Sequence, residues 1–265
     1  MRIHPFNIKQ RKRQTPIVVL TAYTAPVARL LDPHVDILLV GDSLGMVVYG
    51  MPGTETVTME MMMSHGRAVV ASTQQSLVVI DMPAGSYEQS AAQAVISAKR
   101  LIDETGAQAV KLEGGRDRAQ QIRAIVDSGI AVMGHVGLLP QRASEFGGFK
   151  TQGKTPEQAD SIMQDALAAE EAGAFCVVIE ATVEPVARAV SERLAIPTIG
   201  IGASPACDGQ VLVIDDMLGL TARAPKFVKR YANMAQVLEG AVKSYAHEVR
   251  TKVFPAAEHV SAPKH

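Results

Sequence analysis

Short runs of β-branched and other apolar residues recur along the whole chain, and longer stretches with helical spacing separate them. Continuous apolar runs, unlike alternating ones, suit strands that are covered on both faces, as in a parallel sheet. We expect a strand at each of eight runs: Ile17–Leu20, Ile37–Val40, Leu77–Ile80, Ala109–Leu112, Ile130–Met133, Cys176–Ile179, Thr198–Ile201 and Val211–Ile214.

The intervening stretches carry helix start and stop signals. The segment 155–172 opens Thr-Pro-Glu, a capping residue followed by Pro at the first helical position, and ends before a glycine. Alternating strands and helices over about 250 residues predict a (βα)8 TIM barrel. A doubly wound open sheet is the alternative, but the glycine-rich dinucleotide fingerprint is missing after the first predicted strand. The other predicted helices are Met59–Ser72, Ser86–Asp103, Glu184–Leu194 and Pro225–Glu248.

No low-complexity linker or charge block divides the sequence. We therefore predict one barrel domain over residues 1–265, with a basic lead-in at about 1–14 and a polar tail at about 256–265. An apolar content of 47% and a net charge of −1 argue against a disordered chain and against a nucleic-acid partner. No apolar run is long enough to cross a bilayer, and the two cysteines form no metal or disulfide pattern.

Ionisable residues stand at the ends of several predicted strands. In a barrel these ends converge at one mouth, where the active sites of such enzymes lie. Any single acid there could be a helix cap, but the whole set predicts a shared site. Lys111 lies two residues before Glu113, so both face the same side of their strand. The residues that follow their apolar runs are Asp42, Asp81, Glu113, His135 and Glu180.

The residue types at this mouth favour magnesium chemistry on a 2-oxo acid. Carboxylates with one nearby His and no Cys select Mg²⁺, so Asp42 and Asp81 are predicted ligands, and Glu113 reaches the metal or its waters. Three clustered acids would repel one another without a cation. Lys111 can hold a substrate carboxylate or oxyanion. Glu180 ends an apolar run that raises its proton affinity, which suits a general base acting beside a polarised carbonyl.

Two loops are further candidates. The segment Gly137–Lys154 is long for a βα loop, and loops of that size are often lids, so we expect it to cover the site. The segment Gly200–Ser204 could offer backbone donors to an anion, but close strand packing explains its glycines equally well.

Ordered motifs across the chain resemble the ketopantoate hydroxymethyltransferase family. The resemblance runs from about Thr15 to His259. The motifs are Leu20-Thr-Ala-Tyr23, Val40-Gly-Asp-Ser-Leu-Gly-Met46, Val110-Lys-Leu-Glu-Gly-Gly115, Gly134-His-Val-Gly-Leu138, Pro140-Gln141, Phe146-Gly-Gly148, Ile196-Pro-Thr-Ile-Gly-Ile-Gly202, Asp208-Gly-Gln210 and Pro225-Lys-Phe227.

The resemblance implies a barrel of the phosphoenolpyruvate/pyruvate superfamily that uses Mg²⁺ and 5,10-methylenetetrahydrofolate. The implied reaction converts 3-methyl-2-oxobutanoate into 2-dehydropantoate. The motifs also imply roles for individual residues: metal binding by Asp42, Asp81 and Glu113, keto-acid binding by Asp42, Ser43, Asp81, Lys111 and His135, and proton abstraction by Glu180.

The resemblance further implies a cytoplasmic homo-oligomer, commonly a decamer. Thr24 stands where the family usually has Asp, and Ser204 stands where it usually has Gly, which affects the expected shape of the pocket more than the chemistry. Two alternatives remain open at this point. One is a folate-independent Mg²⁺-dependent carbon–carbon lyase or aldolase acting on a 2-oxo acid, and the other is a non-catalytic barrel scaffold.

Overall fold

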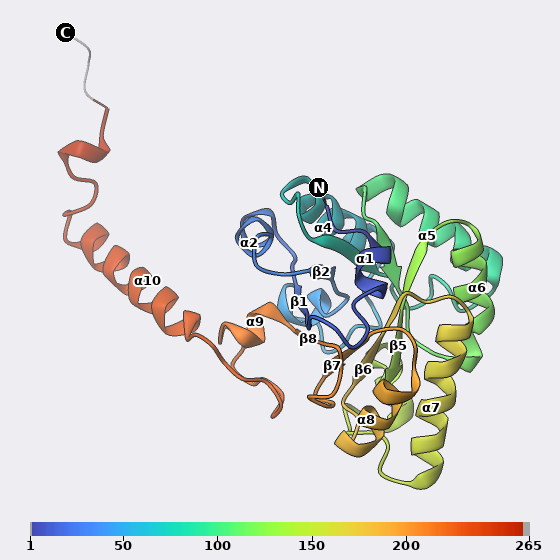
Figure 1. Ribbon diagram of the computed structural model, residues 1–265. Helices are drawn as coiled ribbons and strands as arrows, with labels where there is room; N and C mark the ends of the chain where they lie inside the picture. Colours follow the sequence, from blue (N-terminus) through green and yellow to red (C-terminus); the bar gives the residue numbers. More distant parts are fainter. Residues whose placement is uncertain (1, 262–265) are drawn as a thin grey trace. The chain divides into compact units, whose positions relative to one another are not determined.

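Eight parallel strands form a closed barrel in the computed structural model, which describes residues 2–261 (Figure 1). Each strand pairs with the next, and β8 pairs with β1, so the predicted (βα)8 barrel is confirmed and the open sheet is wrong. The strands are β1 Ile17–Thr21, β2 Ile37–Val40, β3 Leu77–Asp81, β4 Ala109–Lys111, β5 Ala131–Gly137, β6 Cys176–Glu180, β7 Thr198–Ile201 and β8 Gly209–Leu212.

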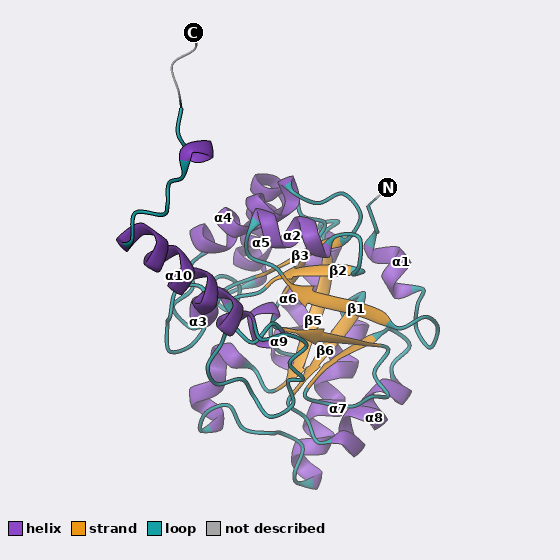
Figure 2. Ribbon diagram, turned by 90° about the vertical axis from the view of Figure 1, so that its left-hand side faces the viewer, coloured by secondary structure: helices purple, strands orange, loops and turns teal. Residues whose placement is uncertain are grey.

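Within the unit that contains the barrel, helices follow β1 to β6 and cover the outside of the sheet (Figure 2). The hydroxyls of Thr58, Ser90 and Thr155 cap α4, α5 and α7 by accepting a hydrogen bond from the third helical amide. The helices are α1 Pro5–Lys9, α2 Ala25–Leu31, α3 Leu44–Val47, α4 Met59–Ala71, α5 Ala91–Thr105, α6 Ala119–Asp127, α7 Pro156–Glu171, α8 Glu184–Arg193, α9 Ile214–Met217 and α10 Met234–Arg250.

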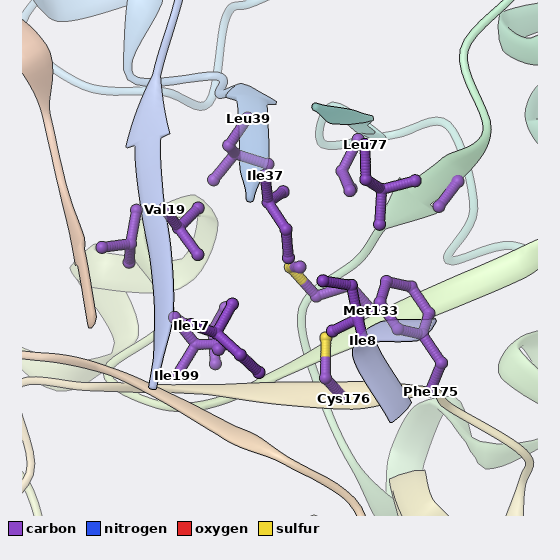
Figure 3. Packing of buried hydrophobic residues seen from close by; sticks show 14 residues of the cluster. Ile8, Ile17, Val19, Ile37, Leu39, Leu77, Met133, Phe175, Cys176 and Ile199 are labelled. Carbon is purple, nitrogen blue, oxygen red and sulfur yellow. The ribbon is translucent and has the colours of Figure 1, made fainter. Parts of the chain in front are cut away.

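Alternate side chains of the strands fill the barrel interior. Residues two apart on one strand, such as Ile17 and Val19 of β1, belong to the same buried cluster (Figure 3). Ile8 of α1 and Phe175, which precedes β6, belong to the same cluster (Figure 3). The amino-terminal end of the barrel is therefore closed by apolar side chains, and a polar site can open only at the opposite end.

The chain divides into two compact units, Met1–Ile214 and Asp215–His265, and the first contains all eight strands. The second contains α10 and a short 3-10 turn at Ala257–His259. The polar tail predicted at about 256–265 lies partly outside the described residues. Within 2–261, no helix has both the length and the apolar character needed to cross a bilayer.

Strand β8 and helix α5 begin elsewhere than expected. Strand β8 starts at Gly209, which pairs with Ile17 of β1. The two strands are so close here that a Cβ at Gly209 would lie 2.4 Å from the Ile17 carbonyl oxygen, so the position requires glycine. Helix α5 starts after Ser90 rather than at Ser86, since residues 83–89 form a loop that buries Tyr87. In both cases a tertiary contact outweighs the local sequence signal.

Candidate active site

The inward faces of four neighbouring strands end in polar residues. Val79, Ala109, Met133 and Val178 lie in the apolar barrel core, so the residues two positions further along each strand form the next inward layer. Strand pairing sets Asp81 opposite Lys111. His135 lies two residues beyond the partner of Lys111 on β5, and Glu180 lies two residues beyond the partner of His135 on β6, so the layer steps along the carboxyl ends of these strands. The layer consists of Asp81, Lys111, His135 and Glu180.

A buried ion pair joins β3 to β4. Lys111 Nζ lies 2.9 Å from Asp81 Oδ1, and both side chains are almost completely buried. The second oxygen of Asp81 accepts a hydrogen bond of 3.0 Å from the backbone amide of Asp42. Burial lowers the pKa of Lys111, but the charges of Asp81, Asp42 and Glu113 outweigh it and raise the pKa overall. Lys111 is therefore a permanent cation at the centre of the site.

Asp42 and Glu113 are buried carboxyls beside this pair. Burial, together with the charge of Asp81, raises the pKa of Asp42 to about 7. Burial and the charge of Asp42 raise the pKa of Glu113 well above its ordinary value. Glu113 Oε1 is a buried oxygen that no hydrogen bond from the described residues reaches. Raised pKa values of this kind are expected for clustered carboxyls whose charge no bound cation neutralises.

His135 connects the ion pair to Glu180. Lys111 Nζ lies 3.3 Å from His135 Nδ1, while Nε2 lies 3.2 Å from Glu180 Oε2. Burial and the nearby Lys111 lower the pKa of His135 well below its ordinary value, so the ring is neutral. Because an ammonium group can only donate, we assign the ring proton to Nε2, where it faces Glu180.

Glu180 is the most accessible acid of the inward layer. It is the last residue of β6, and its side chain is 17% exposed. Burial raises its pKa to about 7, and the charge of Lys111 only partly opposes this effect. A carboxyl with this pKa can take up and release a proton near neutral pH.

Ser43 lies at the edge of the site, beside Asp42 and directly before α3. Its hydroxyl shares a hydrogen bond of 2.8 Å with the hydroxyl of the buried Tyr23. Two departures from the family motifs lie outside the inward layer: Thr24 is exposed before α2, and Ser204 donates a hydrogen bond to Glu184. No contact links either of them to the inward layer in the described part of the chain.

Sequence reasoning assigned no role to Gln141 or Tyr87, which the structure places among the carboxyls. The side chain of Gln141 donates to Asp42 Oδ2 at 2.7 Å, and its backbone amide donates to Glu113 Oε2 at 3.1 Å. The hydroxyl of Tyr87 donates to Gln141 Oε1 at 2.7 Å. The family motif Pro140-Gln141 was the one signal that could have drawn attention to the glutamine.

The first residues of the long segment 137–154 contact the site. Residues Pro140–Phe146 form a 3-10 helix that starts beside the carboxyls, and Gln152 pairs with Thr182 after β6. Most of residues 144–151 are exposed. Both ends of the predicted lid are thus anchored on the barrel.

The residues present fit a magnesium ion held by few protein ligands. Within residues 2–261, no three His, Cys, Asp or Glu side chains form a ready-made metal site. Mg²⁺ usually takes one or two carboxylates and keeps several waters, so Asp42 and Asp81 are sufficient as a donor set. Glu113 Oε1, which lies 3.5 Å from His135 Nδ1 and accepts no hydrogen bond from the described residues, can accept one from such a water.

Comparison with known proteins gives consistent matches over almost the whole chain. A family model described as ketopantoate hydroxymethyltransferase matches residues 2–257. The chain is 59% identical over 261 residues to the 3-methyl-2-oxobutanoate hydroxymethyltransferase of Mesorhizobium japonicum, covering 98% of this chain and 91% of the relative. It is 58% identical over 259 residues to the enzyme of the same name from Paramagnetospirillum magneticum, covering 97% and 94%.

Solved structures with similar folds are more distant in sequence. One is phosphonopyruvate hydrolase in complex with oxalate and Mg²⁺, with a TM-score of 0.62, 12% identity, and coverage of 97% of this chain and 93% of the other. Another is 2,3-dimethylmalate lyase, a member of the PEP mutase/isocitrate lyase superfamily, with a TM-score of 0.61, 15% identity, and coverage of 98% and 89%. At these identities the likeness shows the fold alone.

Proposed function

Because the chain belongs to the ketopantoate hydroxymethyltransferase family and is a transferase, we propose that it transfers a hydroxymethyl group to 3-methyl-2-oxobutanoate. The proposed donor is 5,10-methylenetetrahydrofolate, and the proposed product is 2-dehydropantoate. The observation that carries this proposal is the gathering of Asp42, Asp81, Lys111 and Glu180 at one end of the barrel. This arrangement suits proton removal beside the carbonyl of a small 2-oxo acid.

Asp42 and Asp81 are the proposed protein ligands of Mg²⁺, and Glu113 is the proposed partner of its waters. When bound, Mg²⁺ acts as a Lewis acid that polarises the keto oxygen of the substrate. The chain itself keeps both aspartates in place, since the Asp42 amide donates to Asp81 Oδ2 at 3.0 Å.

Lys111 and Ser43 are proposed to bind the keto acid. Lys111 is a buried cation whose charge can hold a substrate carboxylate or a developing oxyanion. The hydroxyl of Ser43 can donate a hydrogen bond at the same end of the barrel, and its contact with Tyr23 restricts its orientation. His135 lines the pocket as a neutral ring between Lys111 and Glu180.

Glu180 is the proposed base that removes the C3 proton of the keto acid. Its pKa of about 7 makes the ionised form available at neutral pH and a strong enough base for the task. His135 Nε2 lies 3.2 Å from Glu180 Oε2 but forms no hydrogen bond with any described residue, so it remains a free donor beside the proposed base. The carbanion left at C3 then forms the new carbon–carbon bond with the one-carbon unit of the folate. Overall, both bonds between that carbon and the folate nitrogens break, and one water supplies the hydroxyl group. The proton taken up by Glu180 and the remaining proton of the water end on the two nitrogens of the departing tetrahydrofolate.

Dependence on the folate tests this function directly. Product formation from 3-methyl-2-oxobutanoate should require 5,10-methylenetetrahydrofolate, and tetrahydrofolate should appear in equal amount. Cleavage or condensation of a 2-oxo acid without the folate would instead identify a magnesium-dependent lyase or aldolase. A chain that binds the keto acid but turns over nothing under either condition would fit a scaffold.

We also propose that the protein is a homo-oligomer. The apolar side chains of α10 are largely exposed: Val237, Leu238, Val242 and Tyr245 are 57–61% exposed, although the ring of Tyr245 contacts Phe254. On the barrel, the outward-facing Val18 of β1 is 47% exposed. Burying such surfaces against further copies would remove them from water.

Light scattering tests the oligomeric state. The purified chain should give a multiple of 28.2 kDa, and a Val242→Glu/Tyr245→Glu variant should give smaller species. A monomeric parent chain would contradict the proposal.

A further inference from the structure

Gln141 contacts three of the segments that build the site. Its side-chain amide donates to Asp42 Oδ2 at 2.7 Å and to the carbonyl of Met82 at 2.9 Å. These partners follow β2 and β3, whereas Gln141 itself lies in the segment after β5. Its backbone amide donates to Glu113 Oε2, which follows β4. One residue therefore joins the carboxyl ends of β2, β3 and β4.

Tyr87 completes the hydrogen bonding of the Gln141 amide. Its hydroxyl donates to Gln141 Oε1 at 2.7 Å, so the oxygen and the nitrogen of the amide both have buried partners. The same hydroxyl accepts a hydrogen bond of 3.3 Å from the backbone amide of Glu113. Since Oε1 faces a donor and Nε2 faces two acceptors, the amide has only one satisfactory orientation.

We propose that Gln141 is the positioning residue of the metal site: its side chain sets the orientation of the Asp42 carboxylate, its backbone amide holds Glu113, and Tyr87 acts through the side chain. Donation to Oδ2 of Asp42 fixes one oxygen of that carboxyl and leaves Oδ1 as the oxygen for a ligand, and donation to Oε2 of Glu113 leaves Oε1 without a hydrogen bond. This inference rests on the proposed magnesium function.

The geometry differs from that of a residue that only fastens a loop. A loop anchor needs bonds to the backbone, and Gln141 has one in its bond to Met82. Its two other donations, one from the side chain to Asp42 and one from the backbone amide to Glu113, both go to side-chain carboxyl groups of the proposed metal site. Partners of this type behind a metal ligand typically change metal affinity by about 10- to 100-fold.

Mg²⁺ binding by the keto-acid-free protein tests the inference without relying on turnover. We expect Gln141→Met, which keeps the length but removes the amide, to raise the Kd for Mg²⁺ in isothermal titration calorimetry by about tenfold or more. Tyr87→Phe should give a smaller loss. The double variant should bind Mg²⁺ no more weakly than Gln141→Met alone, because Tyr87 acts through the same amide.

Gln108→Met is the matched control. Gln108 lies just before β4, at the opposite end of the barrel, and also uses both atoms of its amide, accepting from Val78 N and donating to the Gly106 carbonyl. Its substitution should change thermal stability without changing the Kd for Mg²⁺.

Three results would overturn the inference: an unchanged Kd in Gln141→Met, a similar loss in Gln108→Met, or additive losses in the double variant. If Gln141→Met does not fold, an unchanged Kd in Tyr87→Phe would overturn it. A parent chain that binds no Mg²⁺ would overturn the proposed function as well.

Discussion

At the scale of single residues, burial gives ordinary carboxyls their distinct chemistry. Asp42 and Glu180 both have a pKa of about 7, and in each case the loss of water is the main cause. Asp32 is the counterexample, because hydrogen bonds from the backbone amides of residues 74–76 outweigh the effect of burial and lower its pKa. A buried carboxyl group is thus either a proton acceptor near neutral pH, as in Asp42 and Glu180, or a fixed anion, as in Asp32, depending on its hydrogen-bond donors.

Asp42→Asn tests the metal assignment. The amide keeps the size of the carboxyl but carries no charge, so we expect the Kd for Mg²⁺ to rise at least about tenfold. Isothermal titration with Mg²⁺ measures this effect. The exposed Asp127 of α6 offers the matched control Asp127→Asn, which should bind like the parent. A titration of Asp42→Asn that overlays the parent would contradict the assignment.

Individual site residues could be predicted where one strand carries the signal. Asp81, Lys111 and Glu180 follow from the apolar runs and the two-residue period, and the structure places them at one end of the barrel. Gln141 could not be predicted in this way, because its contact with Asp42 joins residues 99 positions apart. A glutamine in a loop shows no local pattern that distinguishes a buried donor from a solvated one.

At the scale of elements, pairing between strands changed the predicted boundaries. Strand β5 extends from Ala131 to Gly137, so His135 lies within the strand rather than after it. The extension arises from pairing with β6, in which His135 is opposite Val178 and Gly137 is opposite Glu180. Gly134 and Gly137 lower the strand propensity of this segment, but the hydrogen bonds with β6 hold it in the sheet.

Helix α10 shows the opposite kind of difference. It begins at Met234, although apolar spacing predicted a start at Pro225. The preceding segment turns back, since the amides of Tyr231 and Met234 donate to the carbonyls of Met217 and Leu218. These hydrogen bonds join residues 14 or more positions apart, and the apolar spacing within a few helical turns gives no information about them.

Ile8→Ala tests whether α1 closes the amino-terminal end of the barrel. Ile8 is completely buried in the core cluster, so its truncation should lower the free energy of unfolding by about 2–5 kcal/mol. Urea denaturation followed by circular dichroism measures the change. The control Phe6→Ala lies on the same helix, where Phe6 is 61% exposed, and should have a much smaller effect. Equal effects would show that α1 is not part of the core.

At the scale of the whole molecule, the site is a source of instability in the metal-free protein. The pKa values of Asp42 and Glu180 are about 7 in the folded chain, against ordinary values of 3.8 and 4.5, and that of Glu113 is also raised. Between about pH 5 and 7 the folded state therefore binds more protons than the unfolded state. By linkage, stability falls as the pH rises through this window.

The thermal midpoint of the metal-free protein should accordingly be lower at pH 8 than near pH 6. His135 has the opposite effect on stability below about pH 6.5. There its ring is protonated in the unfolded chain but stays neutral in the folded chain, so the folded state loses stability as the pH falls. Mg²⁺ should raise the midpoint more at pH 8 than at pH 6, since it binds the ionised carboxylates. Differential scanning calorimetry with and without Mg²⁺ measures both effects. A midpoint that rises steadily from pH 6 to 8 without metal would contradict the raised pKa values.

Exchange of the C3 proton tests most directly whether these carboxyls act together. The parent chain with Mg²⁺ should exchange the C3 proton of 3-methyl-2-oxobutanoate for deuterium in ²H₂O, as followed by NMR, and chelation of the metal should stop the exchange. Glu180→Gln should slow it by about 10²-fold or more while the keto acid still binds. Exchange at the parent rate in Glu180→Gln, or exchange indifferent to Mg²⁺, would contradict the account.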